Sequence, residues 1–144
     1  MQSDDDQYNL DRFVAAQDAG ETFRQAITEL SQGRKTSHWM WFVFPQIAGL
    51  GHSPTSRLYA ISSLGEARAY LAHPVLGPRL TECAEIVCGV KDRSAEQIFG
   101  GIDAQKLRSS ATLFALAAPA TQVFQRVLDR YFDGVPDPAT EARI

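Results

Sequence analysis

The feature that most constrains this chain is a run of six consecutive large apolar side chains, from Trp39 to Phe44. In a helix, Trp39 and Trp41 would point about 200° apart, and in a strand alternate side chains would point to opposite faces. No single face can hold the run, so we expect it to pass through the middle of the domain with both tryptophans mostly buried. Ser37 as an N-cap and Pro45 as a stop favour a buried helix of two turns.

Outside this run, apolar residues recur at helical spacing. Intervals of three and four residues separate the apolar positions of segments 23–30, 76–87, 107–114 and 123–131. No run alternates apolar and polar residues over enough positions to require a sheet. The sequence therefore predicts an all-α fold, a single compact globular domain of about six or seven helices joined by short loops.

Capping signals mark the expected helix ends. Ser63 and Ser94 each precede a Glu or Gln by three residues, which is the spacing of a capping box. Asn9 and Asp103 are expected to cap the helices that follow them. The expected C-terminal signals are Gly33, His73 before Pro74, Gly89, Gly100, Pro119 and Gly134. Asp137 before Pro138 could start a final turn.

The length of 144 residues suits one domain. Residues 1–8 offer almost nothing to bury and are expected to form a disordered tail, followed by a single helical domain over residues 9–144. No apolar run approaches the roughly 20 residues that span a bilayer, and the first residues are acidic and polar, unlike a signal peptide. We therefore expect a cytoplasmic protein with no membrane partner.

Charge and reactive side chains exclude several classes of function. The formal net charge is −3, with 14 basic and 17 acidic side chains, which argues against a nucleic-acid partner. Cys83 and Cys88 are five apart on one predicted helix, beyond disulfide reach. His38, His52 and His73 lack the spacing of metal ligands. No metal, cofactor or thiol chemistry is expected, and the sequence leaves open whether the protein is an enzyme.

A stretch of twelve residues, from Gln46 to Arg57, follows the aromatic run and is longer than a usual connection. Gly49 and Gly51 allow close backbone approach, and Arg57 supplies a permanent charge, as an anion site would. The stretch lacks the Gly-Lys-Ser/Thr of a phosphate-binding loop, and Pro54 replaces the third glycine of a dinucleotide fingerprint. The alternative interpretation, which the weakness of this signal favours, is a structural loop that merely turns the chain.

Two functional hypotheses follow. In the first, the protein binds or processes a small anionic ligand, for example a nucleotide, between the aromatic run, the glycine loop and a lysine. The candidate ligand-binding residues are His38, Trp39, Gln46, Gly49, Gly51, Arg57 and Lys106. In the second, it is a non-catalytic helical protein-interaction module whose aromatic run is only core. The position of Arg57, in a concave pocket or on a flat face, discriminates the two.

A family resemblance covers nearly the whole chain. The segment His38–Gln46, followed by Gly49-Leu50-Gly51 and Ser53, resembles the signature of a bacterial domain-of-unknown-function family, number eighteen-ten, whose members are sometimes mislabelled calpastatin. The similarity extends from Asp11-Arg12-Phe13 through His73-Pro74 to Thr112-Leu113-Phe114, with Ala111 in place of an expected methionine. The resemblance implies an all-helical fold, and it implies no established activity, metal or cofactor.

Overall fold

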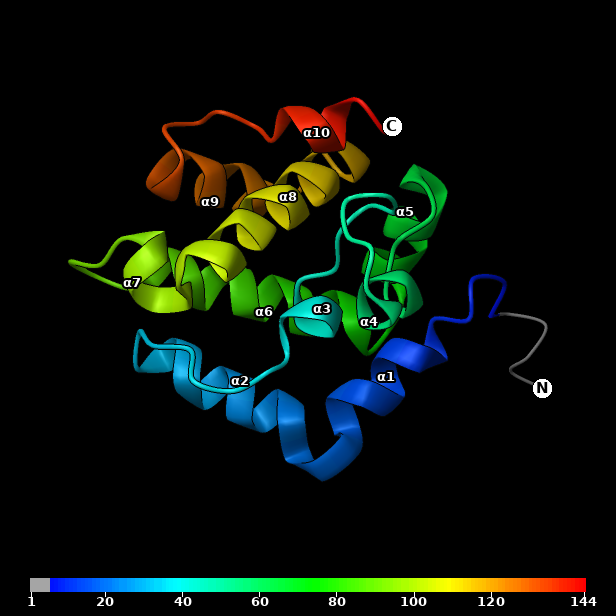
Figure 1. The fold of residues 1–144 in the computed structure, drawn as a ribbon, viewed down its shortest axis with the longest axis horizontal. Coiled ribbons are helices and arrows are strands. Elements are labelled where there is room, and N and C mark those ends of the chain that lie inside the picture. The colour runs from blue at the N-terminus through cyan, green and yellow to red at the C-terminus, as the bar shows by residue number, and fades with distance from the viewer. Residues whose placement is uncertain (1–5) are drawn as a thin grey trace.

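Helices account for the regular secondary structure of residues 6–144, the part of the chain that the computed structural model describes (Figure 1). The elements are α1 (Asp11–Asp18), the 3₁₀ turn η1 (Ala19–Glu21), α2 (Thr22–Ser31), α3 (Met40–Val43), α4 (Pro54–Leu58), α5 (Leu64–Ala72), α6 (Leu76–Gly89), α7 (Ala95–Phe99), α8 (Gly101–Ala117), α9 (Val123–Tyr131) and α10 (Pro138–Glu141). Within these residues, the only β pairing is an isolated bridge between Ile47 and Ile61.

Six of these helices have eight or more residues: α1, α2, α5, α6, α8 and α9. The prediction of an all-α domain with about six or seven helices is therefore confirmed. No helix of residues 6–144 combines the length and the apolar character that crossing a bilayer requires.

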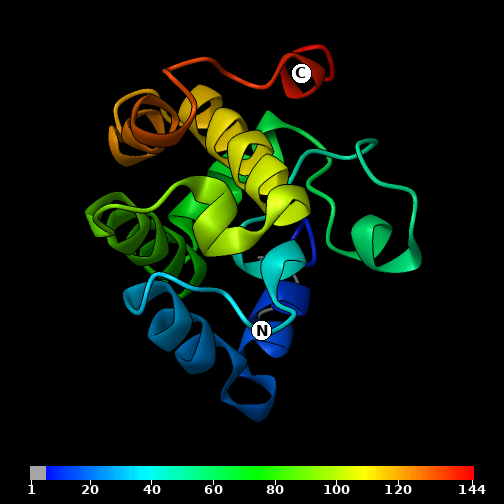
Figure 2. The same ribbon diagram turned by 60° about the vertical axis from the view of Figure 1, so that its left-hand side comes forward.

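The two longest helices, α6 and α8, organise the packing. Helix α8 packs against α5, α7, α9 and α10, whereas α6 packs against α2, α5 and α9. Figures 1 and 2 show α9 and α10 on one side of this central pair and α1 and α2 on the other. The core lies between these layers, because the apolar stripes of α6 and α8 both face inward.

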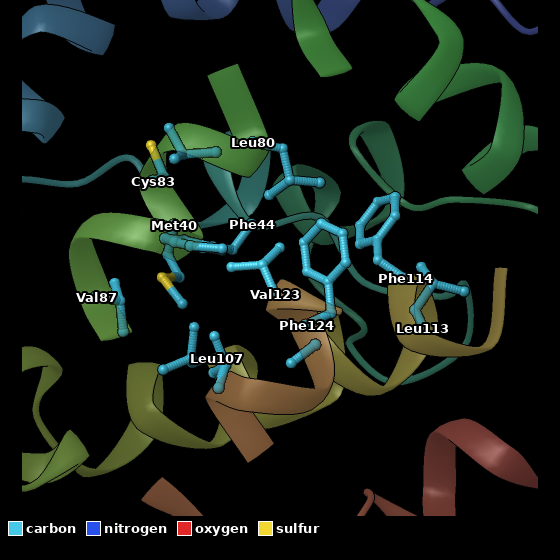
Figure 3. Packing of buried hydrophobic residues seen from close by; sticks show 14 of the residues in the cluster. Met40, Phe44, Leu80, Cys83, Val87, Leu107, Leu113, Phe114, Val123 and Phe124 are labelled. Carbon is cyan, nitrogen blue, oxygen red and sulfur yellow. The ribbon is translucent and has the colours of Figure 1, made fainter. Parts of the chain in front are cut away.

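Figure 3 shows how the aromatic segment enters this core. Met40 and Phe44 lie among Leu80 and Val87 of α6 and Leu107 of α8. All five of these side chains are buried. The expectation that the segment runs through the middle of the domain is therefore correct.

The predicted helix of two turns in this segment is wrong. Only the single turn of α3 forms, with Trp39 at its N-cap position and Phe44 leaving the helix in an extended conformation. Ser37 does not cap α3, because its hydroxyl and its backbone N–H both donate to the carboxylate of Glu29 in α2. The hydrogen bonds of Ser37 to Glu29 thus replace the predicted Ser37 cap, and α3 is shorter than predicted.

Glu29 has a buried carboxylate that accepts hydrogen bonds from the segment of the chain that leads into α3. Its Oε1 accepts from the backbone N–H groups of Thr36 at 2.8 Å and Ser37 at 3.0 Å, and from the indole Nε1 of Trp39 at 2.9 Å. Its Oε2 accepts from the Ser37 hydroxyl and from Gln25. Burial alone would raise the pKa of Glu29, but these hydrogen bonds outweigh it and hold the pKa well below its ordinary value.

At the N-terminus, Asp6 and not Asn9 caps α1. The Asp6 carboxylate accepts from the backbone N–H groups of Leu10 and Asp11, while Asn9 adopts a left-handed conformation with φ of 53°. Residues 1–5 of the predicted tail lie outside the described residues. Tyr8, at the end of that predicted tail, packs against the core.

The other capping predictions have mixed outcomes. Ser94 forms the complete capping box of α7, as predicted. Ser63 accepts from Glu66 N–H at the start of α5, but the Glu66 carboxylate turns to the backbone and hydroxyl of Ser62, so that box is only half formed. His73 ends α5 as expected, and its Nδ1 also accepts from the first N–H groups of α6.

Asp103 does not cap α8. The helix begins two residues earlier, at Gly101, and Asp103 lies in its first turn. Its carboxylate instead pairs with Lys35 at 2.8 Å and with Lys106 at 3.1 Å. Burial raises the pKa of Asp103, but the hydrogen bonds and charges of the two lysines lower it by more, so the group stays ionised.

The two tryptophans should contribute unequally to stability. Trp39 is fully buried, whereas Trp41 is only partly buried, so the expectation of two mostly buried indoles holds more fully for Trp39 than for Trp41. We expect Trp39→Ala to lower the free energy of unfolding by about 3–5 kcal/mol and Trp41→Ala to lower it by about 1–2 kcal/mol. Denaturant melts of both variants check this, and equal losses would contradict it.

Replacing the Glu29 carboxylate should change how stability depends on pH. Because folding lowers the pKa of Glu29, its contribution is present above its ordinary value of 4.5 and is lost as the pH falls below it. Glu29→Gln should therefore cost about 1–3 kcal/mol near pH 7 and less near pH 3. Urea melts at several pH values measure the difference, with exposed Glu82→Gln as the control. A difference that does not shrink at low pH would contradict this account.

Candidate functional site

Two adjoining cavities lie beside Trp41. The loop cavity, of about 250 Å³, is bordered by Trp41, Gln46, Gly49, Gly51, Ser56, Arg57 and four neighbouring residues of the segment 47–60. The helix cavity, of about 430 Å³, is bordered by Trp41, Gln46, Leu50, Gly51, Ile102, Gln105, Lys106, Ser109, Asp137 and Ala139. Trp41, Gln46 and Gly51 border both, so the two cavities adjoin, and we refer to them together as the cleft.

The segment that follows α3 is closed at its base by the bridge between Ile47 and Ile61. The Ala48 N–H donates to the Ile61 carbonyl, and the Ile61 N–H donates to the Gln46 carbonyl, both at 2.8 Å. Within it, the expected irregular stretch contains the short helix α4, capped by the Ser53 hydroxyl. These bonds give the segment a fixed shape, so it is more than a flexible connection.

Arg12 of α1 holds the far end of this segment. Its guanidinium donates to the carbonyls of Leu58 at 2.7 Å and Ala60 at 2.8 Å. It also pairs with Glu66 of α5 at 2.9 Å, whose side chain is only 3% exposed. A buried, multiply bonded arginine of this kind is costly to remove, so Arg12 ties the outer wall of the loop cavity to the helical core.

The structure explains why two positions in the wall of the loop cavity are occupied by glycine. Gly49 has φ of 97°, a conformation that other residues rarely adopt, and a Cβ there would lie 2.8 Å from Nη1 of Arg143. A Cβ on Gly51 would lie 2.8 Å from the side chain of Ser56 in α4. The close approach of the backbone to α4 therefore depends on Gly51.

Hydrogen-bond donors without partners border the loop cavity. Within residues 6–144, the backbone N–H groups from Gly49 to Ser53 donate no hydrogen bond to the protein, and of these residues Gly49 and Gly51 border the loop cavity. Arg57 is exposed, and in the same part of the chain it forms no ion pair. The N–H groups of Gly49 and Gly51, in the same cavity as the guanidinium-bearing Arg57, make an environment suited to an oxyanion.

Lys106 borders the helix cavity but is already engaged. Its Nζ lies 3.9 Å from the centre of the Trp41 ring and 3.1 Å from the Asp103 carboxylate. The cation–π contact holds Trp41 against α8 and so fixes the wall that separates the two cavities. Lys106 therefore positions Trp41, and Asp103 balances its charge.

Asp137 is a site residue that sequence analysis did not single out for binding. Its carboxylate is buried and borders the helix cavity together with Ser109 and Gln105, both of which donate to it. The available signal was the dipeptide Asp137-Pro138, which we interpreted only as the start of a final turn, and Asp137 does cap α10. The contact with Ser109 spans 28 residues of sequence, so no local pattern could indicate it.

The structure brings together five of the seven sequence-predicted site residues. Gln46, Gly49, Gly51 and Arg57 border the loop cavity, and Lys106 borders the helix cavity. His38 is exposed and Trp39 is buried against Glu29, and neither borders the cleft. Among residues 6–144, no group of three or more His, Cys, Asp or Glu side chains is arranged to hold a metal ion.

Comparison with known proteins gives the family. The family model described as "Protein of unknown function (DUF1810)" matches residues 7–144. The crystal structure of the conserved hypothetical protein Rv1873 from Mycobacterium tuberculosis is similar, with 52% sequence identity, a TM-score of 0.91, and coverage of 94% of this chain and 95% of that one. No match was found among curated proteins.

The chain therefore belongs to the DUF1810 family, as the resemblance of its aromatic and glycine motifs indicated. The relative of known structure is itself described only as hypothetical, so the family gives the fold and leaves the function to be argued from the cleft.

Proposed function

We propose that this protein binds a small anionic ligand in the loop cavity, with Arg57 and the backbone N–H groups of Gly49 and Gly51 as the binding groups. The observation that carries the proposal is a guanidinium that borders a concave site and has no acidic partner within residues 6–144. The alternative role for Arg57, pairing with an acidic residue of a neighbouring helix, has no support among the described residues.

Local charge favours a small ligand over a polymer. The net charge of −3 provides no broad basic surface, so the attraction to an anion is confined to the cavity. The expectations of a cytoplasmic location, and of a partner that is neither a nucleic acid nor a membrane, remain part of this proposal.

The groups that border the loop cavity support binding. Its described lining contains no histidine, cysteine or carboxylate, and the Ser56 hydroxyl donates to the Ser53 carbonyl. Tyr59 is the one residue of this lining, besides Ser56, whose side chain carries a hydroxyl group. We assign no catalytic step to the cavity.

One observation favours the second hypothesis, a protein-interaction module. Ile102, at the edge of the helix cavity, is 77% exposed, and Leu58 of α4 is 54% exposed. Exposed apolar side chains beside a cleft are also found where a protein partner docks. The two hypotheses differ in what they require of Arg57, since docking through Ile102 and Leu58 needs no anion.

A thermal-shift screen against phosphate and phosphorylated metabolites tests the proposal. A ligand at 100 times its dissociation constant adds about 2.7 kcal/mol to the free energy of unfolding, which raises the melting temperature by several degrees. Arg57→Ala should keep the fold, because the side chain is exposed, and should lose this increase.

Arg34→Ala is the matched control, since Arg34 is also exposed and lies after α2, outside the cleft. The control should respond to the ligand as the parent does. If Arg57→Ala unfolds, or keeps the full response to the anion, Arg57 is structural and the proposal fails.

A further inference from the structure

The helix cavity is bordered by a hydrogen-bond acceptor, the carboxylate of Asp137, whereas the loop cavity is bordered by hydrogen-bond donors. Asp137 has only 4% of its surface exposed and borders the helix cavity. Its Oδ2 accepts from the hydroxyls of Ser109 at 2.9 Å and Thr140 at 2.6 Å, and from the Thr140 N–H at 3.2 Å. These three donors occupy one oxygen and leave the other largely available.

The second oxygen, Oδ1, accepts from Gln105 Nε2 at 3.3 Å, and the backbone N–H of Ala139 also donates to the carboxylate. Each carboxylate oxygen offers about two acceptor positions, so Oδ1 is the less occupied of the two, and Gln105 beside it also borders the cavity. Within residues 6–144, no cation pairs with Asp137. An unpaired buried charge of this kind attracts a hydrogen-bond donor or a cation.

Asp137 stays ionised and fixed in place. Burial raises its pKa, but the hydrogen bonds from Thr140, Ser109 and the backbone lower it by more, so the pKa lies below its ordinary value. The backbone is held as well, because the Asp137 N–H donates to the Thr112 hydroxyl at 2.9 Å and Arg108 donates to the carbonyls of Val135 and Pro136. A rigid acceptor discriminates between ligands better than a mobile one.

The two cavities adjoin, because Trp41, Gln46 and Gly51 border each of them. The apolar edge of the helix cavity is formed by Leu50 and Ile102. Its volume of about 430 Å³ lies in the range of pockets that hold small organic molecules. The cleft thus offers an oxyanion site at one end and a carboxylate acceptor at the other.

We infer that the ligand is a phosphomonoester whose organic part carries hydroxyl or amino groups, with its phosphate in the loop cavity and one of these donors on Oδ1 of Asp137. The two N–H groups of Gly49 and Gly51, which have no acceptor within residues 6–144, and a forked guanidinium suit an anion with three terminal oxygens. This inference rests on the proposed function and adds the chemical class of the ligand and the residue that selects it.

The test compares four probes on the intact protein by calorimetric titration: inorganic phosphate, phenyl phosphate, ribose 5-phosphate and adenosine 5′-monophosphate. Phenyl phosphate has the anion without hydroxyl or amino donors. The parent should bind ribose 5-phosphate or adenosine 5′-monophosphate about tenfold more tightly than phenyl phosphate, as one charge-assisted hydrogen bond provides. This comparison needs no variant and is independent of any effect on folding.

The variant Asp137→Asn then tests whether Asp137 causes the preference for phosphate esters that carry hydroxyl or amino groups. Asparagine is an equally good helix cap, so α10 should be retained. The variant should lose about tenfold in affinity for the preferred ester while its affinity for inorganic phosphate changes by less than about twofold. Exposed Asp129→Asn, on α9, is the matched control and should bind all probes as the parent does.

The outcomes separate this inference from the proposed function. If no probe binds the parent, the anion site itself is refuted. If the probes bind and Arg57→Gln weakens all of them, yet neither donor-bearing ester exceeds phenyl phosphate, the anion site stands and the role of Asp137 is refuted. If Asp137→Asn and the parent bind every ester with equal affinity, the role of Asp137 is likewise refuted.

Discussion

The hydrogen bonds to the buried carboxylate of Glu29 determine how the aromatic segment enters the core. Five donors converge on this one side chain, and the indole of Trp39 is among them. Because Trp39 is fixed on Glu29, the single turn of α3 directs Trp41 away from the core and against Lys106 of α8. Within this one apolar run, Trp39 thus fills the core, whereas Trp41 forms the wall of the cleft.

The cleft depends on a second set of long-range contacts. Arg12 binds the carbonyls of Leu58 and Ala60, and the bridge between Ile47 and Ile61 closes the base of the segment. The C-terminal part of the chain completes the far side, where α10 lies beside α8 (Figure 1). There the Ser109 hydroxyl of α8 donates to the Asp137 carboxylate. The cleft is therefore assembled from parts of the chain that are distant in sequence, on elements that pack into the core.

Sequence patterns predicted those structural features that depend on residues close together in the sequence. The all-α fold and the capping box at Ser94 were predicted because apolar spacing and caps act within one or two turns. The contact of Trp39 with Glu29 spans 10 residues, and that of Asp137 with Ser109 spans 28, so the shortened helix and the second half of the cleft were missed. Gly49, Gly51 and Arg57 of the glycine loop do border one cavity, and their role in binding an anion stays a prediction.

A nuclear magnetic resonance titration of the ¹⁵N-labelled protein with inorganic phosphate tests the central claim most directly. The two indole N–H signals serve as an internal comparison, since Trp41 borders the cleft while Trp39 is bonded to Glu29. The account predicts that the amide signals of Gly49 and Gly51 and the indole signal of Trp41 shift together and saturate, while the indole signal of Trp39 stays in place. Saturable shifts that occur elsewhere and leave Gly49, Gly51 and Trp41 unchanged would contradict it.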